Sequence, residues 1–74
     1  MIPKVDLHGI KHENVSTTLD TFIWEQMKKN SSVIHVITGN SSEMKRIVTE
    51  IANEYGFTVA DSFGNEAQMT IHLM

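Results

Sequence analysis

The sequence Val5-Asp6-Leu7-His8-Gly9 decides how the chain begins its fold. Apolar and polar residues alternate along it, as they do in a short strand, whose alternate side chains share a face. We therefore expect Asp6 and His8 on one face, Val5 and Leu7 on the other, and Gly9 at the end of the strand. A carboxylate and an imidazole at the carboxyl end of a strand lie where α/β folds commonly carry out their chemistry.

Asp6 and His8 also allow a structural interpretation, in which Asp6 caps a neighbouring turn and His8 is an ordinary edge residue. In the chemical interpretation the two side chains act together. Residues two apart on a flat strand are too distant for an easy direct hydrogen bond. Their cooperation is therefore expected to pass through substrate or water.

Length and composition predict one domain spanning residues 1–74. The hydrophobic content of 41% and the charged content of 20% are those of an ordinary globular protein and exclude disorder. A chain without cysteine has neither disulfides nor thiolate catalysis. Because no apolar run is long enough for a membrane span and no signal-peptide pattern is visible, we expect a cytoplasmic location without a membrane partner.

The net charge of −3, with six lysines and arginines in all, limits how nucleic acid could be bound. Nonspecific binding depends on cations that neutralise phosphates, so any contact with DNA or RNA must be local. The four histidines, His8, His12, His35 and His72, lie on separate expected elements without a short ligand spacing. No metal site is predicted, and a divalent metal ion as cofactor is left open.

An amphipathic helix is predicted over residues 13–29, because apolar residues recur there at three- and four-residue steps. The stripe consists of Val15, Leu19, Phe22, Ile23, Gln26 and Met27. Trp24 falls beside this stripe and is expected to be half-buried, covering the edge of the core. The alternative is a platform on which a nucleic-acid base stacks.

Val33–Ile37 is a β-branched apolar run typical of a central, often parallel strand, and His35 within it is expected to be a hydrogen-bonded interior or sheet-face residue. The small-residue loop 38–42 then leads into a second helix. Asn40 is the expected N-cap, and Glu43 completes a capping-box pattern. The backbone N–H groups of such a loop can hold a phosphate, although capping alone explains the same residues.

The second helix gives the clearest periodic signal in the chain. Its apolar residues are Met44, Ile47, Val48, Ile51, Ala52 and Tyr55, and Gly56 is expected to end it. Residues 57–63 and 68–73 then alternate as two strands, paired antiparallel through a turn at 64–66. Met69, Ile71 and Leu73 are expected to face inward.

The predicted order is β-α-β-α-β-β, an α/β chain folded as an α+β two-layer sandwich. Right-handed crossovers place both helices on one face of a four-stranded mixed sheet. If strands 5–8 and 33–37 are parallel neighbours, their carboxyl ends meet at one edge. Asp6, His8 and the loop 39–42 are then expected to share a cleft.

The motif at residues 5–9, followed by a helix, a β-branched strand and Thr38-Gly39 opening a second helix, resembles the Smr (small MutS-related) domain family. The resemblance covers residues 5–73. It implies the two-layer fold and a nucleic-acid role, commonly endonuclease activity that nicks DNA or RNA. By the same resemblance, Asp6 and His8 are the catalytic acid and histidine. Such a domain is usually joined to a larger protein, whereas this one is expected to stand alone.

The expected phosphate- and nucleic-acid-binding residues surround the start of the second helix. They are Gly9, Lys11, Thr38, Gly39, Asn40, Ser41, Ser42, Lys45 and Arg46. The loop of the Smr family normally reads Gly-Lys-Gly, whereas this chain has Gly39-Asn40-Ser41. A cation that would face phosphate and a glycine that lets the backbone come close are both missing.

Two classes of function follow. In the first, the chain hydrolyses phosphodiester bonds of DNA or RNA, with His8 as general acid or base and Asp6 fixing its tautomer or positioning a water. In the second, the chain binds without cleaving: it is a nucleic-acid-binding module, or a protein-interaction module that uses Trp24 and Tyr55 as exposed aromatic residues.

Overall fold

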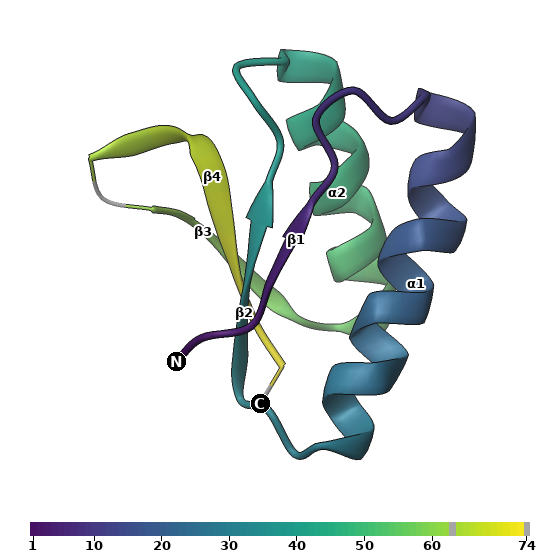
Figure 1. The fold of residues 1–74 in the computed structure, drawn as a ribbon, viewed down its shortest axis with the longest axis vertical. Coiled ribbons are helices and arrows are strands. Elements are labelled where there is room, and N and C mark those ends of the chain that lie inside the picture. Colours follow the sequence, from purple (N-terminus) through teal and green to yellow (C-terminus); the bar gives the residue numbers. More distant parts are fainter. Residues whose placement is uncertain (63, 74) are drawn as a thin grey trace.

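Six elements form two layers, a sheet and a pair of helices. The computed structural model describes residues 1–62 and 64–73. The elements are β1 (Lys4–Asp6), α1 (His12–Lys28), β2 (Val33–Ile37), α2 (Ser42–Tyr55), β3 (Thr58–Ser62) and β4 (Asn65–His72). The sheet order is β1-β2-β4-β3, with β1 parallel to β2 and β4 antiparallel to both of its neighbours. Both helices cover one face of the sheet (Figure 1), so the predicted α+β two-layer architecture is confirmed.

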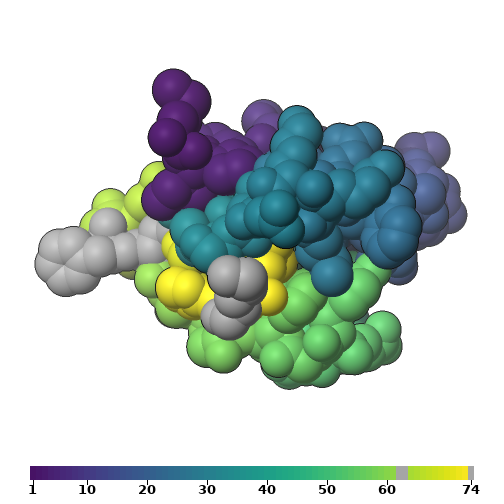
Figure 2. Space-filling model, turned by 90° about the horizontal axis from the view of Figure 1, so that it is seen from below, coloured from purple at the N-terminus to yellow at the C-terminus, as the bar shows by residue number. Residues whose placement is uncertain are grey.

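The core lies between the sheet and the two helices. Its buried apolar side chains are Leu7, Val15, Leu19, Ile23, Ile34, Val36, Met44, Val48, Ile51, Ala52, Met69, Ile71 and Leu73. Alternation along β2 buries Ile34 and Val36, so His35 lies half-buried on the opposite, helix-free face. In Figure 2, which shows the molecule from below, the N-terminal residues project from the surface.

The first helix begins and ends one residue earlier than predicted. Val15, Leu19, Ile23 and Gln26 are buried, and the Gln26 Oε1 accepts a hydrogen bond from Ser31 Oγ at 3.0 Å. Phe22 is partly buried.

The half-buried position predicted for Trp24 is wrong, since 62% of this residue is exposed. Trp24 follows the buried Ile23, and successive residues lie about 100° apart around a helix. This turn carries Trp24 away from the core, and the Lys28 ammonium lies 5.8 Å from the centre of its ring.

The first strand ends at Asp6, two residues earlier than predicted. Leu7 N still donates to Ile37 O at 2.8 Å, but the chain then turns, and Ile10 N donates to Leu7 O at 3.1 Å. The cause is the Asp6 side chain, because its carboxylate accepts the His8 N–H at 3.0 Å and so takes this group away from the sheet.

The second helix is capped by Ser41, so the prediction of Asn40 as N-cap is wrong. Ser41 Oγ accepts the Met44 N–H at 3.1 Å, which is the usual reach from an N-cap to the third residue of a helix. Glu43 is therefore one residue too early for a capping box, and its carboxylate binds Arg46 instead. At the other end Gly56 adopts a left-handed conformation, with φ +82°, as expected for the residue that ends the helix.

The predicted antiparallel pairing of the last two strands is confirmed. The strand β4 begins at Asn65, so Asn65 and Glu66 belong to the strand instead of the turn. The Asn65 side chain accepts the Ala67 N–H at 3.1 Å, and the register between the strands shifts between Asp61 and Ser62. Phe63, predicted to end the third strand, lies outside the described residues.

Candidate functional site

The side chains of Asp6 and His8 form a direct pair at the end of β1. His8 Nδ1 lies 2.6 Å from Asp6 Oδ1, and the same oxygen accepts the His8 backbone N–H. The prediction that these side chains do not bond directly is wrong. It assumed a flat strand, in which residues two apart are separated by about 6.6 Å. The chain turns after Asp6, and the turn folds the imidazole back onto the carboxylate.

The pairing favours the ionised form of Asp6 and one tautomer of a neutral His8. The hydrogen bond from the His8 ring, followed by the one from the His8 N–H, lowers the pKa of the Asp6 carboxyl below its ordinary value. An ionised carboxylate only accepts hydrogen bonds, so Nδ1 of a neutral His8 carries the hydrogen and Nε2 keeps its lone pair. With 68% of the His8 side chain exposed, Nε2 is open to a ligand and can accept a proton.

Beside His8 lies the loop that joins β2 to α2. A Cβ built on Gly39 would be 3.6 Å from the His8 Cβ, so the two backbones approach closely. Gly39 has φ +68°, a left-handed conformation that favours glycine. The predicted meeting of the β1 and β2 ends therefore occurs, and it follows from the parallel pairing of Asp6 with Ile37.

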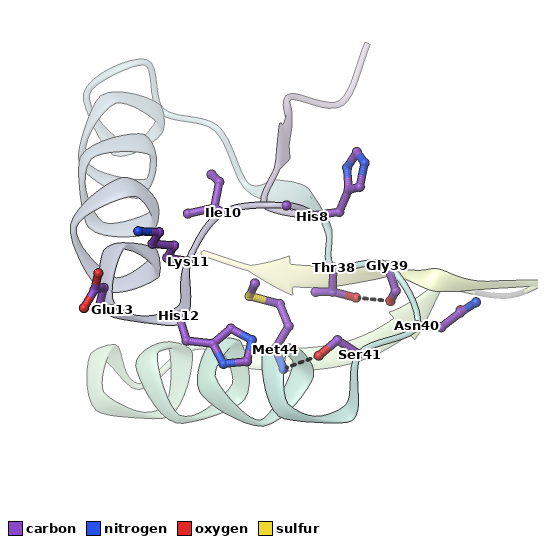
Figure 3. A pocket seen from close by; sticks show the side chains of 11 residues that line it. His8, Ile10, Lys11, His12, Glu13, Thr38, Gly39, Asn40, Ser41 and Met44 are labelled. Atoms are coloured by element: carbon purple, nitrogen blue, oxygen red, sulfur yellow. Dashed lines mark hydrogen bonds between the residues drawn. The ribbon is translucent and has the colours of Figure 1, made fainter.

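An open cleft of about 720 Å³ lies between the segment that follows β1 and the loop that joins β2 to α2. Its lining residues are His8, Gly9, Ile10, Lys11, His12, Glu13, Thr38, Gly39, Asn40, Ser41 and Met44 (Figure 3). Six of the predicted binding residues thus line one space with His8: Gly9, Lys11, Thr38, Gly39, Asn40 and Ser41. Asp6 adjoins this cleft through its bond to His8.

Two backbone N–H groups of this loop already donate hydrogen bonds within the protein. The N–H groups of Thr38 and Gly39 donate to Ala67 O at 2.8 and 3.1 Å, so they tie the loop to β4 and do not serve the cleft. The Thr38 hydroxyl donates to Gly39 O at 2.8 Å and is buried with its residue. In the first turn of α2, the Met44 N–H donates to Ser41 Oγ and the Lys45 N–H to Ser41 O, so the N–H groups of Ser42 and Glu43 remain as the donors with no acceptor within the helix.

Both helices begin at this cleft. Ser41 caps α2, whereas Lys11, the N-cap of α1, makes no capping hydrogen bond with its side chain. Helix N-termini carry partial positive charge, so two of them at one cleft favour an anionic ligand. The Lys11 ammonium adds a positive charge to the same wall, and the Glu13 carboxylate adds a negative one.

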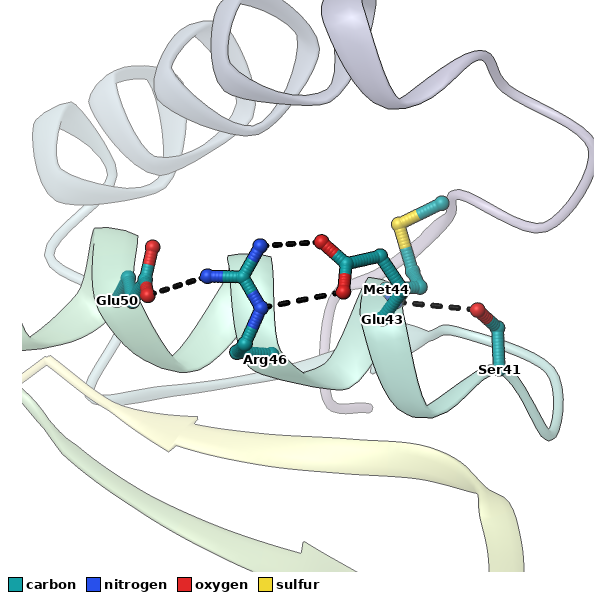
Figure 4. A network of polar contacts seen from close by, with 5 residues as sticks. All are labelled: Ser41, Glu43, Met44, Arg46 and Glu50. Atoms are coloured by element: carbon teal, nitrogen blue, oxygen red, sulfur yellow. Dashed lines mark hydrogen bonds and ion pairs between the residues drawn. The ribbon is translucent and has the colours of Figure 1, made fainter.

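The other predicted binding residues lie outside this cleft. Ser42 begins α2 without lining it, and Lys45 lines a neighbouring hollow that includes Asn40 and Asp61. Arg46 lies along the exposed side of α2 between two carboxylates (Figure 4). Its guanidinium donates to Glu43 at 3.2 Å through Nε and also through Nη2, and to Glu50 at 2.5 Å through Nη1.

Glu43 and Glu50 neutralise the positive charge of Arg46, which the sequence predicted to bind phosphate. The hydrogen bond from Arg46 is the largest cause that lowers the pKa of Glu43. Spacings of three and four residues bring charged helical side chains together, so this ion pairing was readable from residues 43, 46 and 50.

Four further residues line the cleft that the sequence did not assign to it: Ile10, His12, Glu13 and Met44. His12 and Glu13 are the two with titratable side chains. His12 is the first residue of α1, and its ring points toward Met44 and Ser41 (Figure 3). A signal was present, because a helix that begins three residues after the motif glycine must start at the same edge of the sheet.

The exposed aromatic residues lie on the helices. Trp24 projects from α1, while the Tyr55 ring stacks on Phe57 with centroids 5.1 Å apart and its hydroxyl donates to Asp20 at 3.0 Å. A protein partner at these residues stays a prediction.

Among residues 1–62 and 64–73, no group of three or more His, Cys, Asp or Glu side chains is arranged to hold a metal ion. Neither helix in this part of the chain combines the length and apolar character of a membrane span. Comparison of the sequence and the structure with protein-family models, curated proteins and solved structures gave no match.

Proposed function

We propose that this domain acts on nucleic acid and hydrolyses phosphodiester bonds, as its resemblance to Smr domains suggests. The observation that carries the proposal is the exposed Asp6–His8 pair, hydrogen-bonded at 2.6 Å beside a cleft at which two helices begin. A phosphate bound at the helix N-termini would occupy the cleft that His8 also lines.

The chemistry assigns one task to each part of the cleft. His8 Nε2 takes a proton from the attacking water, since Nδ1 is held by Asp6. Asp6 keeps the ring in this tautomer and stabilises the imidazolium that forms, as a positioning residue. The partial positive charge of the α2 N-terminus and the Lys11 ammonium stabilise the charge on the phosphate oxygens.

Cleavage of two substrates tests the proposal. Purified protein is incubated with supercoiled plasmid DNA and with structured RNA, each with and without a divalent metal ion. We expect products that His8→Ala reduces by about 100-fold or more, the usual contribution of a general base. The matched control is His72→Ala, because His72 is an exposed histidine near the far end of β4. Equal rates for wild type and His8→Ala would refute the assignment.

A second candidate is a module that binds nucleic acid in the same cleft without cleaving it. The observation in its favour is the small number of cations at the cleft. Glu43 and Glu50 neutralise Arg46, and Lys11 is the one lysine or arginine among the described cleft-lining residues. This candidate predicts weak binding that falls further, with a shallow slope, as salt is raised, and no product after long incubation.

A further inference from the structure

The helix-free face of the sheet carries Asp6 and, beside it, a second hollow. We propose that a single strand of nucleic acid runs from the cleft past His8 onto this face, where its next base stacks on His35. This inference rests on the proposed function and deepens it, since it names single-stranded nucleic acid as the substrate class.

Strand register places Lys4 and Asp6 on the helix-free face. Alternate residues of β2 are buried against the helices, so His35 and Ile37 face the other way. Lys4 is paired with His35, and Asp6 with Ile37. Partners in register lie side by side on the same face of a sheet. Lys4 and Asp6 therefore point away from the helices too, in agreement with their exposure.

The His8 ring follows Asp6 to this side of the molecule. Its Nδ1 lies 2.6 Å from the Asp6 carboxylate. In Figure 3 the ring points back along β1, away from His12 and the loop 38–41. His8 nevertheless lines the cleft. The residue thus lies at the border between the cleft and the helix-free face, so a ligand that contacts its ring extends onto that face.

The hollow next to this border has a volume of about 700 Å³. Its lining residues are Met1, Ile2, Pro3, Lys4 and His35. Figure 1 shows the N-terminus on the side of β1 away from both helices. Lys4 precedes Asp6 by two positions, which is about 6.6 Å along a strand. One nucleotide of an extended single strand covers such a distance, so a phosphate at His8 places the neighbouring base within reach of His35.

The lining of the hollow suits an unpaired base. The His35 imidazole and the side chains of Met1 and Ile2 offer surfaces on which a base packs, and the Lys4 ammonium is available to the adjoining phosphate. His35 is half-buried within the sheet, so little conformational freedom is lost when a base stacks on it. Stacking requires a base that can leave its neighbours, which a single strand offers and a duplex does not.

The charges of the two layers favour the same path. The two helices contain three basic residues and six of the nine acidic ones, which are Glu13, Asp20, Glu25, Glu43, Glu50 and Glu54. A polyanion is repelled by such a surface. Among the registered residues of the helix-free face in β1, β2 and β4, Lys4, His35 and His72 accompany one carboxylate, that of Asp6, which already binds His8. The strand is therefore expected along the sheet and not across the helices.

Two substitutions of His35 test the stacking. His35→Phe keeps an aromatic ring, whereas His35→Leu removes it. In fluorescence anisotropy with a labelled single-stranded oligonucleotide, we expect His35→Leu to weaken binding about five-fold or more, the lower end of what one stacked base contributes, and His35→Phe to retain binding. The matched control is His72→Ala, which should bind like wild type, because His72 lies on the same face but pairs with Val33, farther from His8. A duplex of the same sequence should bind wild type more weakly.

The outcomes separate this inference from the proposed function. If His35→Leu binds as tightly as His35→Phe, or the duplex binds as tightly as the single strand, the inference is wrong, while cleavage that depends on His8 still supports the proposed function. Binding that depends on the His35 ring, without any product, retains the inference and refutes the hydrolysis. A wild-type protein that neither binds nor cleaves overturns both.

The fold of the variants and the occupant of the face are checked separately. Thermal unfolding shows whether His35→Leu and His35→Phe are equally folded, so that a difference in their binding reports the ring. Sedimentation of the free protein detects self-association. A dimer that His35→Leu dissociates would mean that a second copy of the chain covers this face, and would overturn the inference.

A further measurement does not depend on substitution. A single-stranded oligonucleotide is titrated into the protein while the ring resonances of the histidines are followed by NMR. We expect the His8 and His35 rings to shift together and the His72 ring to stay. A titration in which His8 shifts and His35 does not would overturn the inference and retain the cleft.

Discussion

Replacing the cap of α2 distinguishes the observed helix start from the predicted one. Ser41→Ala removes the single hydrogen bond of 3.1 Å from Met44 N to Ser41 Oγ. Loss of an N-cap typically costs about 1 kcal/mol. For a domain of this length, about 1 kcal/mol corresponds to a melting temperature lower by about 4–8 °C.

Asn40→Ala is the matched control, because Asn40 precedes Ser41 and its side chain makes no hydrogen bond within the described part of the chain. We expect its free energy of unfolding to change by less than about 0.5 kcal/mol. Thermal and urea unfolding followed by circular dichroism measure both variants. A larger loss for Asn40→Ala than for Ser41→Ala would mean that the helix begins at Asn40 and that the reasoning is wrong.

Three further predictions concern the cleft and its support. The Asp6 carboxyl, followed by NMR, should titrate below its ordinary pKa of 3.8, and His8→Ala should return the pKa toward that value. The small stability that the pair contributes is present above pH 3.8 and is lost as the pH falls through the lowered pKa. In fluorescence anisotropy with a labelled oligonucleotide, Lys11→Ala should weaken binding more than Arg46→Ala, because Arg46 is held by two carboxylates outside the cleft. Leu7→Ala should lower the free energy of unfolding by about 2–5 kcal/mol in urea titrations, since Leu7 is fully buried, and a loss below about 1 kcal/mol would contradict its place in the core.

The pattern of apolar residues predicted those elements whose structure is determined by which of their own residues are buried. The strand Val33–Ile37 has the predicted bounds, and α2 buries Met44, Val48, Ile51 and Ala52 from its expected stripe. The apolar stripe of α2 has one clear period, and Val33–Ile37 is a nearly continuous β-branched run, so competing structures of either segment would expose apolar side chains.

Local side-chain choices could not be read from the pattern. Asn40 and Ser41 are both good N-caps by residue type. The residue that is capped is the one three positions before the buried Met44, whose N–H the cap accepts, and the local sequence alone does not single it out. The end of β1 depends in the same way on the Asp6 carboxylate, which competes with the sheet for the His8 N–H.

The site was predicted in outline and missed in detail. Parallel pairing of β1 and β2 was enough to bring His8 and Gly39 together. The sequence could not show that Thr38 and Gly39 give their N–H groups to Ala67, because that contact comes from a strand near the other end of the chain. It also assigned no role to His12, whose approach to the cleft depends on where α1 begins.

The central claim is that nucleic acid binds where the two helices begin. Titrating an isotope-labelled sample with a short oligonucleotide, and following backbone amide shifts, tests this claim most directly. We predict shifts concentrated at residues 8–12 and 38–43, which weaken as salt is raised. Shifts that leave both segments unmoved, or that gather around Trp24 and Tyr55 instead, would contradict it.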